Sequence, residues 1–218
     1  MIELQTRYNF TFNFLVGAAA LTKMAIQINN KGVEATETEY FEYKSFVAGS
    51  IMQSVAALES EAWSILNHGP GHHLGSNGLD NEAKEILSII ADSLEKEPIL
   101  DRYNLILQLT KRKKLDLGAQ PMQDLRLLIG LRNEITHFKS LLTKEMDNKK
   151  LLNALEEKDS TRPSFFPQGH MNFFPHICLN HIRAKWAVDT AVAFIDYYYK
   201  EMEIKSPIEG QNRQHITI

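Results

Sequence analysis

The segment Glu39–Leu66, EYFEYKSFVAGSIMQSVAALESEAWSIL, decides the fold class of this chain. Apolar side chains recur along it near the 3.6-residue period of an α-helix, which predicts one long helix with a buried face. The recurring positions are Phe46, Ile51, Val55, Leu58, Ala62 and Ile65. A helix with such a face needs other helices to cover it.

Similar helical patterns occupy most of the remaining chain, and no convincing alternating strand or hairpin pattern interrupts them. The further helices are expected at about Phe10–Asn29, Asp80–Lys96, Ile99–Lys113, Pro121 to about Glu157, and Pro175–Glu203. The fold class is therefore all-α, a bundle of five or six helices. We expect one domain over residues 1–218, with an N-terminal helix and linker at 1–38, a core bundle at 39–203 and a loose tail at 204–218.

Composition and charge limit the classes of function. A net charge of −3, from 24 basic and 27 acidic residues, excludes a large nucleic-acid coat and leaves at most a local basic surface such as Lys111–Lys114. The single cysteine, Cys178, rules out an intramolecular disulfide and favours a reducing compartment. The apolar run Phe10–Leu21 is too short to span a bilayer, and a helix is a better interpretation than a signal peptide. We expect a cytoplasmic protein without membrane contact.

The segment Leu131–Ser140, LRNEITHFKS, carries the main candidate site. An apolar stripe at Leu127, Leu131, Ile135, Phe138 and Leu142 orients the expected helix. Arg132 and His137 are five residues apart, which places them roughly 140° apart around an ideal helix. Asn133 lies four residues before His137 and shares its side. The pair either lines a polar seam or consists of two solvated surface residues.

The all-helical pattern, the string RNEITH near the end of one helix and the long apolar helix that follows resemble HEPN domains. In that family an arginine, a polar residue and a later histidine mark the site, and Arg132, Asn133 and His137 match this pattern. The resemblance covers Phe41–Glu203. It implies a four-helix core, to which the first helix would be an addition, and a homodimer that brings two Arg–His pairs into one cleft. Many members are metal-independent endoribonucleases, often toxins or antiviral effectors; others only bind nucleotides or partners.

This chemistry needs neither a cofactor nor a metal, because the 2′-hydroxyl of RNA supplies the nucleophile. A histidine exchanges protons near neutral pH, and a guanidinium stabilises charge on a phosphate. We assign His137 as general acid/base, Arg132 as phosphate stabiliser and Asn133 as orienting partner. From the family architecture, Glu59 or Glu61 would hold Arg132. We expect RNA as substrate and, for a toxin, an inhibitory partner protein.

Two other functions remain open at this point. The first is a non-catalytic helical module that binds a nucleotide or a protein. The second is a metal-dependent hydrolase, which would use His68, His72 and His73 together with His170, His176 and His181. Aromatic residues at Phe165–Pro175 and Tyr197–Tyr199 could stack bases, although packing in the bundle is the simpler interpretation. The sequence does not assign a role to the histidine-rich loop or to the FFP segment.

Overall fold

The computed structural model describes residues 10–68, 80–94, 96–137, 149–161, 176–209 and 211–218. These ranges are helical and contain no β-strand, which confirms the all-α class. The α-helices are α1 (Thr11–Asn29), α2 (Glu37–His68), α3 (Asn81–Leu94), α4 (Ile99–Leu109), α5 (Gln120–Thr136), α6 (Lys149–Lys158) and α7 (His181–Glu201). Short 3-10 turns lie at Gly32–Glu34, His176–Cys178 and Arg213–His215.

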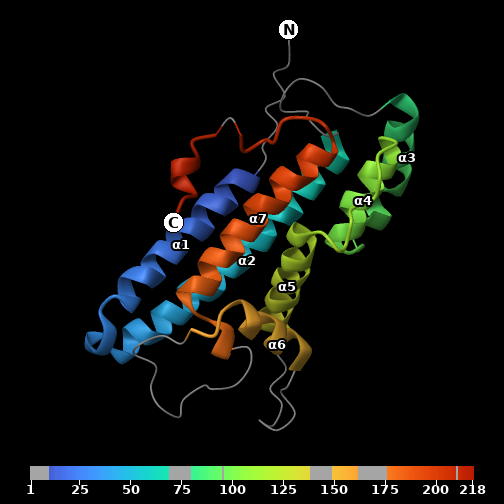
Figure 1. Cartoon of the computed structure of the whole chain (residues 1–218). Helices are drawn as coiled ribbons and strands as arrows, with labels where there is room; N and C mark the ends of the chain where they lie inside the picture. The colour runs from blue at the N-terminus through green and yellow to red at the C-terminus, as the bar shows by residue number, and fades with distance from the viewer. Residues whose placement is uncertain (1–9, 69–79, 95, 138–148, 162–175, 210) are drawn as a thin grey trace.

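The centre of the molecule is formed by α1, α2 and α7, which run side by side along its length (Figure 1). The face of α1 toward its neighbours is made of small and aliphatic residues, and Leu15, Ala18, Ala19 and Ala25 are fully buried. A buried hydrogen bond of 2.8 Å joins the hydroxyls of Thr22 and Ser50 between α1 and α2. The sequence predicts α1 as an addition to a core that starts at residue 39; instead α1 is part of the core.

Among the described helices, α1 is the one long and apolar enough to cross a membrane, judged by length and composition alone. Core helices of soluble proteins and signal sequences pass the same test. The property therefore says nothing about where the protein resides.

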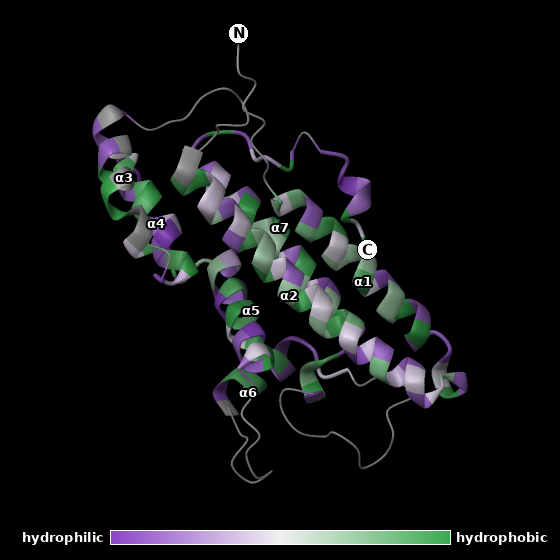
Figure 2. Ribbon diagram, turned by 180° about the vertical axis from the view of Figure 1, so that it is seen from behind, coloured by the Kyte–Doolittle hydropathy of each residue, from purple (hydrophilic) through white to green (hydrophobic). Residues whose placement is uncertain are grey.

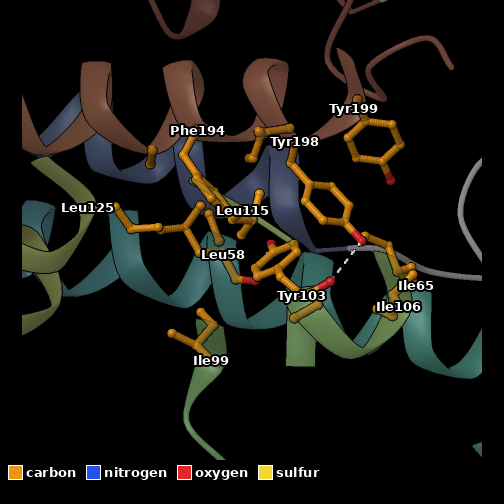
Figure 3. Close-up of a cluster of buried hydrophobic side chains, with 14 of the residues drawn as sticks. Leu58, Ile65, Ile99, Tyr103, Ile106, Leu115, Leu125, Phe194, Tyr198 and Tyr199 are labelled. Carbon is orange, nitrogen blue, oxygen red and sulfur yellow. Dashed lines mark hydrogen bonds between the residues drawn. The ribbon is translucent and has the colours of Figure 1, made fainter. Parts of the chain in front are cut away.

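An aromatic cluster joins α4 to the central helices (Figure 3). The ring of Tyr103 on α4 lies 4.6 Å from the Tyr198 ring and 4.9 Å from the Phe194 ring, both edge-on. Its hydroxyl donates a 2.8 Å hydrogen bond to the Leu58 carbonyl of α2. Edge-to-face rings stabilise a core beyond their buried area, and the bonded hydroxyl removes the cost of burying it. Beyond this cluster, α3 and α4 lie side by side at one edge (Figures 1 and 2).

The helix that carries the candidate site is shorter than predicted. We expected it to run from Pro121 to about Glu157, but α5 ends at Thr136 and a separate α6 covers Lys149–Lys158. The buried face of α5 is also rotated from the predicted stripe: Met122, Leu125, Leu128 and Leu131 are buried, whereas Leu127 and Ile135 are only half-buried. Phe138 and Leu142 lie outside the described residues.

The C-terminal residues are not a loose tail. Ile208 and Ile216 are buried against the core that surrounds α4 and α7. The guanidinium of Arg213 contacts both carboxylate oxygens of Asp196 on α7, at 2.9 and 3.0 Å. Two buried isoleucines and an ion pair from Arg213 Nη2 to Asp196 hold this segment on the bundle, against the expectation for residues 204–218.

Candidate functional site

Arg132 lies in the last turn of α5 and extends the buried face of that helix. It follows Leu125 by seven residues and Leu128 by four, spacings that place the three side chains on one side. There its Nη2 donates to Oε1 of Glu59 on α2. The side chains of Arg132 and Glu59 are 22% and 41% exposed. Nε of Arg132 is buried, and no described residue accepts a hydrogen bond from it.

His137 is exposed and stands at the end of α5, where the backbone leaves helical geometry. Its φ and ψ are −108° and 28°, and its backbone N–H donates to the carbonyl of Asn133 at 2.8 Å. Since Arg132 faces α2, the 140° separation expected on an ideal helix leaves His137 on the outer side. Within one chain, the arginine and the histidine thus occupy different sides of the helix.

Asn133 is exposed on the same outer side of α5 as His137. Between Arg132 and His137, the hydroxyl of Thr136 donates to the carbonyl of Arg132 at 2.9 Å. This bond and the Asn133–His137 backbone bond close the helix end. The outer end of α5 therefore presents an amide and an imidazole to solvent, and the inner side presents a guanidinium neutralised by a carboxylate.

Glu61 does not contact Arg132, although it is only two residues from Glu59. It is fully buried, and its two carboxyl oxygens accept hydrogen bonds from Thr11 on α1, at 2.8 Å, and from Tyr199 on α7. Glu61 therefore links the three central helices. Of the two carboxylates proposed to hold Arg132, Glu59 makes the contact and Glu61 belongs to the core.

A second polar cluster, not predicted from the sequence, joins the start of α2 to the start of α7. The Tyr43 hydroxyl accepts the backbone N–H of His181 at 2.9 Å and lies 3.2 Å from His181 Nδ1. The donor in the contact between the hydroxyl and Nδ1 is set by the imidazole tautomer, because the hydroxyl can either donate or accept there. Burial raises the pKa of Tyr43. Burial also lowers the pKa of His181, against an opposing effect of Asp159.

Two buried cations complete this cluster. Lys44 donates to the carbonyls of His176 and Leu179 at 3.0 and 2.8 Å. Arg183 donates to the carbonyls of Leu155 and Asp159, at 2.7 and 2.8 Å, and so holds the C-terminal end of α6. These bonds account for the burial of both charges as structural connections between helix ends.

The pKa values of two further groups in this cluster, His176 and Asp159, are also shifted. Burial lowers the pKa of His176, and the Lys44 charge lowers it further. Burial alone would raise the pKa of Asp159, but hydrogen bonds from Thr161 and the charge of Arg183 bring it below its usual value. A signal for part of the cluster was present in the sequence, since Asn180 caps α7 by accepting the Arg183 backbone N–H at 2.7 Å.

The other residues singled out in the sequence, namely the histidines, the aromatic segments and the cysteine, do not form a second site among the described residues. In the described part of the chain, no group of three or more His, Cys, Asp or Glu side chains is arranged to hold a metal ion; His72, His73 and His170 lie outside it. Tyr198 and Tyr199 are buried and cannot stack bases, as the packing interpretation predicts. Cys178 is buried. The FFP segment lies outside the described residues.

The cluster Lys111–Lys114 is only partly free to act as a basic surface. Lys111 lies 3.8 Å from Asp80, and Arg112 pairs with Glu203. The side chains of Lys113 and Lys114 are exposed.

The structure is thus an all-helical protein in which the end of α5 carries a partly buried arginine–carboxylate pair on its inner side and an exposed histidine on its outer side. Comparisons with family models, curated proteins and solved structures found no match to this chain.

Proposed function

We propose that this protein is a metal-independent endoribonuclease of the HEPN type, with Arg132 and His137 as its working residues. The observation that carries the proposal is the exposure of the His137 imidazole at the end of α5, one turn beyond a partly exposed guanidinium. In the reaction, the 2′-oxygen of RNA loses its proton and bonds to phosphorus. The P–O5′ bond breaks, and the 5′-oxygen takes a proton. His137 transfers protons and Arg132 stabilises the phosphorane charge.

The active unit in this proposal is a pair of chains. Arg132 and His137 of one chain occupy different sides of α5, so one chain does not bring both groups to one phosphate. A two-fold arrangement allows the histidine of one chain to meet the arginine of the other. A cytoplasmic toxin or defence effector, restrained by an inhibitory partner protein, is the biological role consistent with this activity.

The first experiment incubates purified protein with RNA in EDTA. We expect cleavage with 2′,3′-cyclic phosphate ends by the wild type and loss of cleavage in His137→Gln and Arg132→Ala. His215→Gln and Arg126→Ala change exposed residues elsewhere and serve as matched controls. Activity that EDTA abolishes and zinc restores would instead indicate a metal-dependent hydrolase.

A mixing experiment tests whether the centre forms between two chains. His137→Gln and Arg132→Ala, each inactive alone, are denatured together and refolded as a mixture. A centre shared between chains restores part of the activity, because each mixed dimer contains one intact Arg–His pair. A centre within one chain leaves the mixture inactive.

A non-catalytic module that binds nucleotides or a protein is the second candidate, and one observation favours it. The Glu59 carboxylate neutralises Arg132 in the free chain, an arrangement suited to reversible anion binding without chemistry. Intact RNA in all of the incubations above, together with measurable RNA or nucleotide binding by the wild type, would select this candidate.

A further inference from the structure

We propose that Glu59 is an internal competitor of the RNA phosphate: its carboxylate occupies Arg132 in the free protein, and phosphate binding displaces it. The inference rests on the proposed function only in taking an RNA phosphate as the ligand of Arg132. It assigns Glu59 a role opposite to that of a permanent support for the arginine.

The geometry of the pair is that of a replaceable contact. Glu59 reaches only Nη2 of Arg132, and Nε has no hydrogen-bond acceptor among the residues that the structure describes. The guanidinium is therefore not held by a bidentate carboxylate along its Nε edge, the geometry that fixes an arginine most firmly. With its side chain 41% exposed, Glu59 can turn into water when another anion arrives.

The same helix provides a comparison with a structural carboxylate. Glu61 is fully buried and accepts hydrogen bonds on both of its oxygens, from Thr11 and Tyr199. Glu59 is half-exposed and has one cationic partner. Two glutamates only two residues apart on α2 thus have different surroundings. The surroundings of Glu59 allow another anion to replace its carboxylate at Arg132.

The energetics favour displacement. A half-exposed ion pair changes an equilibrium constant by a factor of about five or less. An RNA phosphodiester carries one negative charge, as the Glu59 carboxylate does, but its two non-bridging oxygens can accept two parallel bonds from the guanidinium, whereas Glu59 accepts from Nη2 alone. Removing the Glu59 charge should strengthen phosphate binding by about three- to fivefold, because phosphate no longer has to break the Glu59–Arg132 ion pair.

The test measures binding of a fluorescent single-stranded 2′-O-methyl RNA, which cannot be cleaved, by fluorescence anisotropy across a series of salt concentrations. The variants are Glu59→Gln, Arg132→Gln and the double variant. Glu42→Gln is the matched control, because Glu42 is an exposed glutamate on α2 about 25 Å along the helix from Glu59. Circular dichroism confirms that each variant is folded.

We expect Glu59→Gln to bind about three- to fivefold more tightly than the wild type at low salt and Glu42→Gln to change affinity less than twofold. The salt dependence of Glu59→Gln should be steeper by about 0.7 in the log–log slope, the value for one further phosphate contact on a single strand. The gain should vanish in the Arg132→Gln background.

Equal or weaker binding by Glu59→Gln, including no binding by either protein, would overturn the competitor role. A gain that persists without Arg132 would also overturn it, because the effect would then be general electrostatics. Tighter binding by Glu59→Gln without RNA cleavage by the wild type would leave the competitor role standing and remove the nuclease activity, so the two proposals fail separately.

Discussion

The buried contact between Glu61, Thr11 and Tyr199 gives the most direct test of how the bundle is held together. Thr11 and Tyr199 donate to different oxygens of the one carboxyl group, and all three side chains are buried. The contact joins α1, α2 and α7, so its loss should destabilise the whole fold and not one helix alone.

The perturbation is Tyr199→Phe, which removes one donor and retains the ring. A hydrogen bond to a charged group contributes about 1.5–3 kcal/mol, and a buried oxygen that loses its donor is not compensated by water. We expect the free energy of unfolding to fall by about 2 kcal/mol. Thr11→Val should cost a similar amount, and the double variant should deviate from additivity because both donors contact one carboxyl group.

The assay is urea unfolding followed by circular dichroism, with Tyr198→Phe as the matched control. Tyr198 is the neighbouring buried tyrosine, but its hydroxyl makes only a long 3.4 Å contact with the carbonyl of Tyr103 (Figure 3). Its loss should cost under about 1 kcal/mol. Equal losses for Tyr199→Phe and Tyr198→Phe, or a loss below about 0.5 kcal/mol for Tyr199→Phe, would refute the role assigned to Glu61.

Three further predictions concern other parts of the fold. Burial lowers the pKa of His181, so the unfolded chain binds more protons than the folded chain below about pH 6.5. The free energy of unfolding should therefore decrease as pH falls through about 6.5 toward the pKa of the folded state. In urea titrations at a series of pH values, His181→Gln should flatten this dependence, whereas His215→Gln, at an exposed position, should not. Arg183→Ala should lower the free energy of unfolding by about 3–5 kcal/mol, because it removes two charge-assisted hydrogen bonds at the end of α6 and leaves the Leu155 carbonyl with only the Asp159 N–H; unchanged stability in chemical unfolding would contradict this role. Ile208→Ala should cost about 2–4 kcal/mol in the same assay, whereas a tail that is not packed would show no change.

Periodicity alone predicted the long second helix well. The segment expected at Glu39–Leu66 is helical from Glu37 to His68, because its apolar positions recur on one face over many turns. The end of α5 was harder to predict. Apolar residues continue the pattern beyond Thr136 in the sequence. The backbone leaves helical geometry at His137, where no glycine or proline in the sequence marks the end of a helix.

At the candidate site, the sequence identified the residues but not their directions. The contact between Arg132 and Glu59 follows from the relative rotation of α2 and α5, which one-dimensional spacing does not contain. Glu61 illustrates the same limit, since nothing in the string LESEAW distinguishes a buried carboxyl group from an exposed one. The cluster around Tyr43 and His181 was missed because its members are 138 residues apart.

The central position of α1 has a consequence for biosynthesis. α1 leaves the ribosome well before α7, on which part of its packing surface lies, and the partners Glu61 and Tyr199 of α2 and α7 are 138 residues apart in the chain. At translation rates of about 5–20 residues per second, Tyr199 of α7 follows Glu61 of α2 by about 7–28 seconds. During that interval the apolar face of α1 must be kept from aggregating, and α2 is the first of its two helical packing partners to be synthesised.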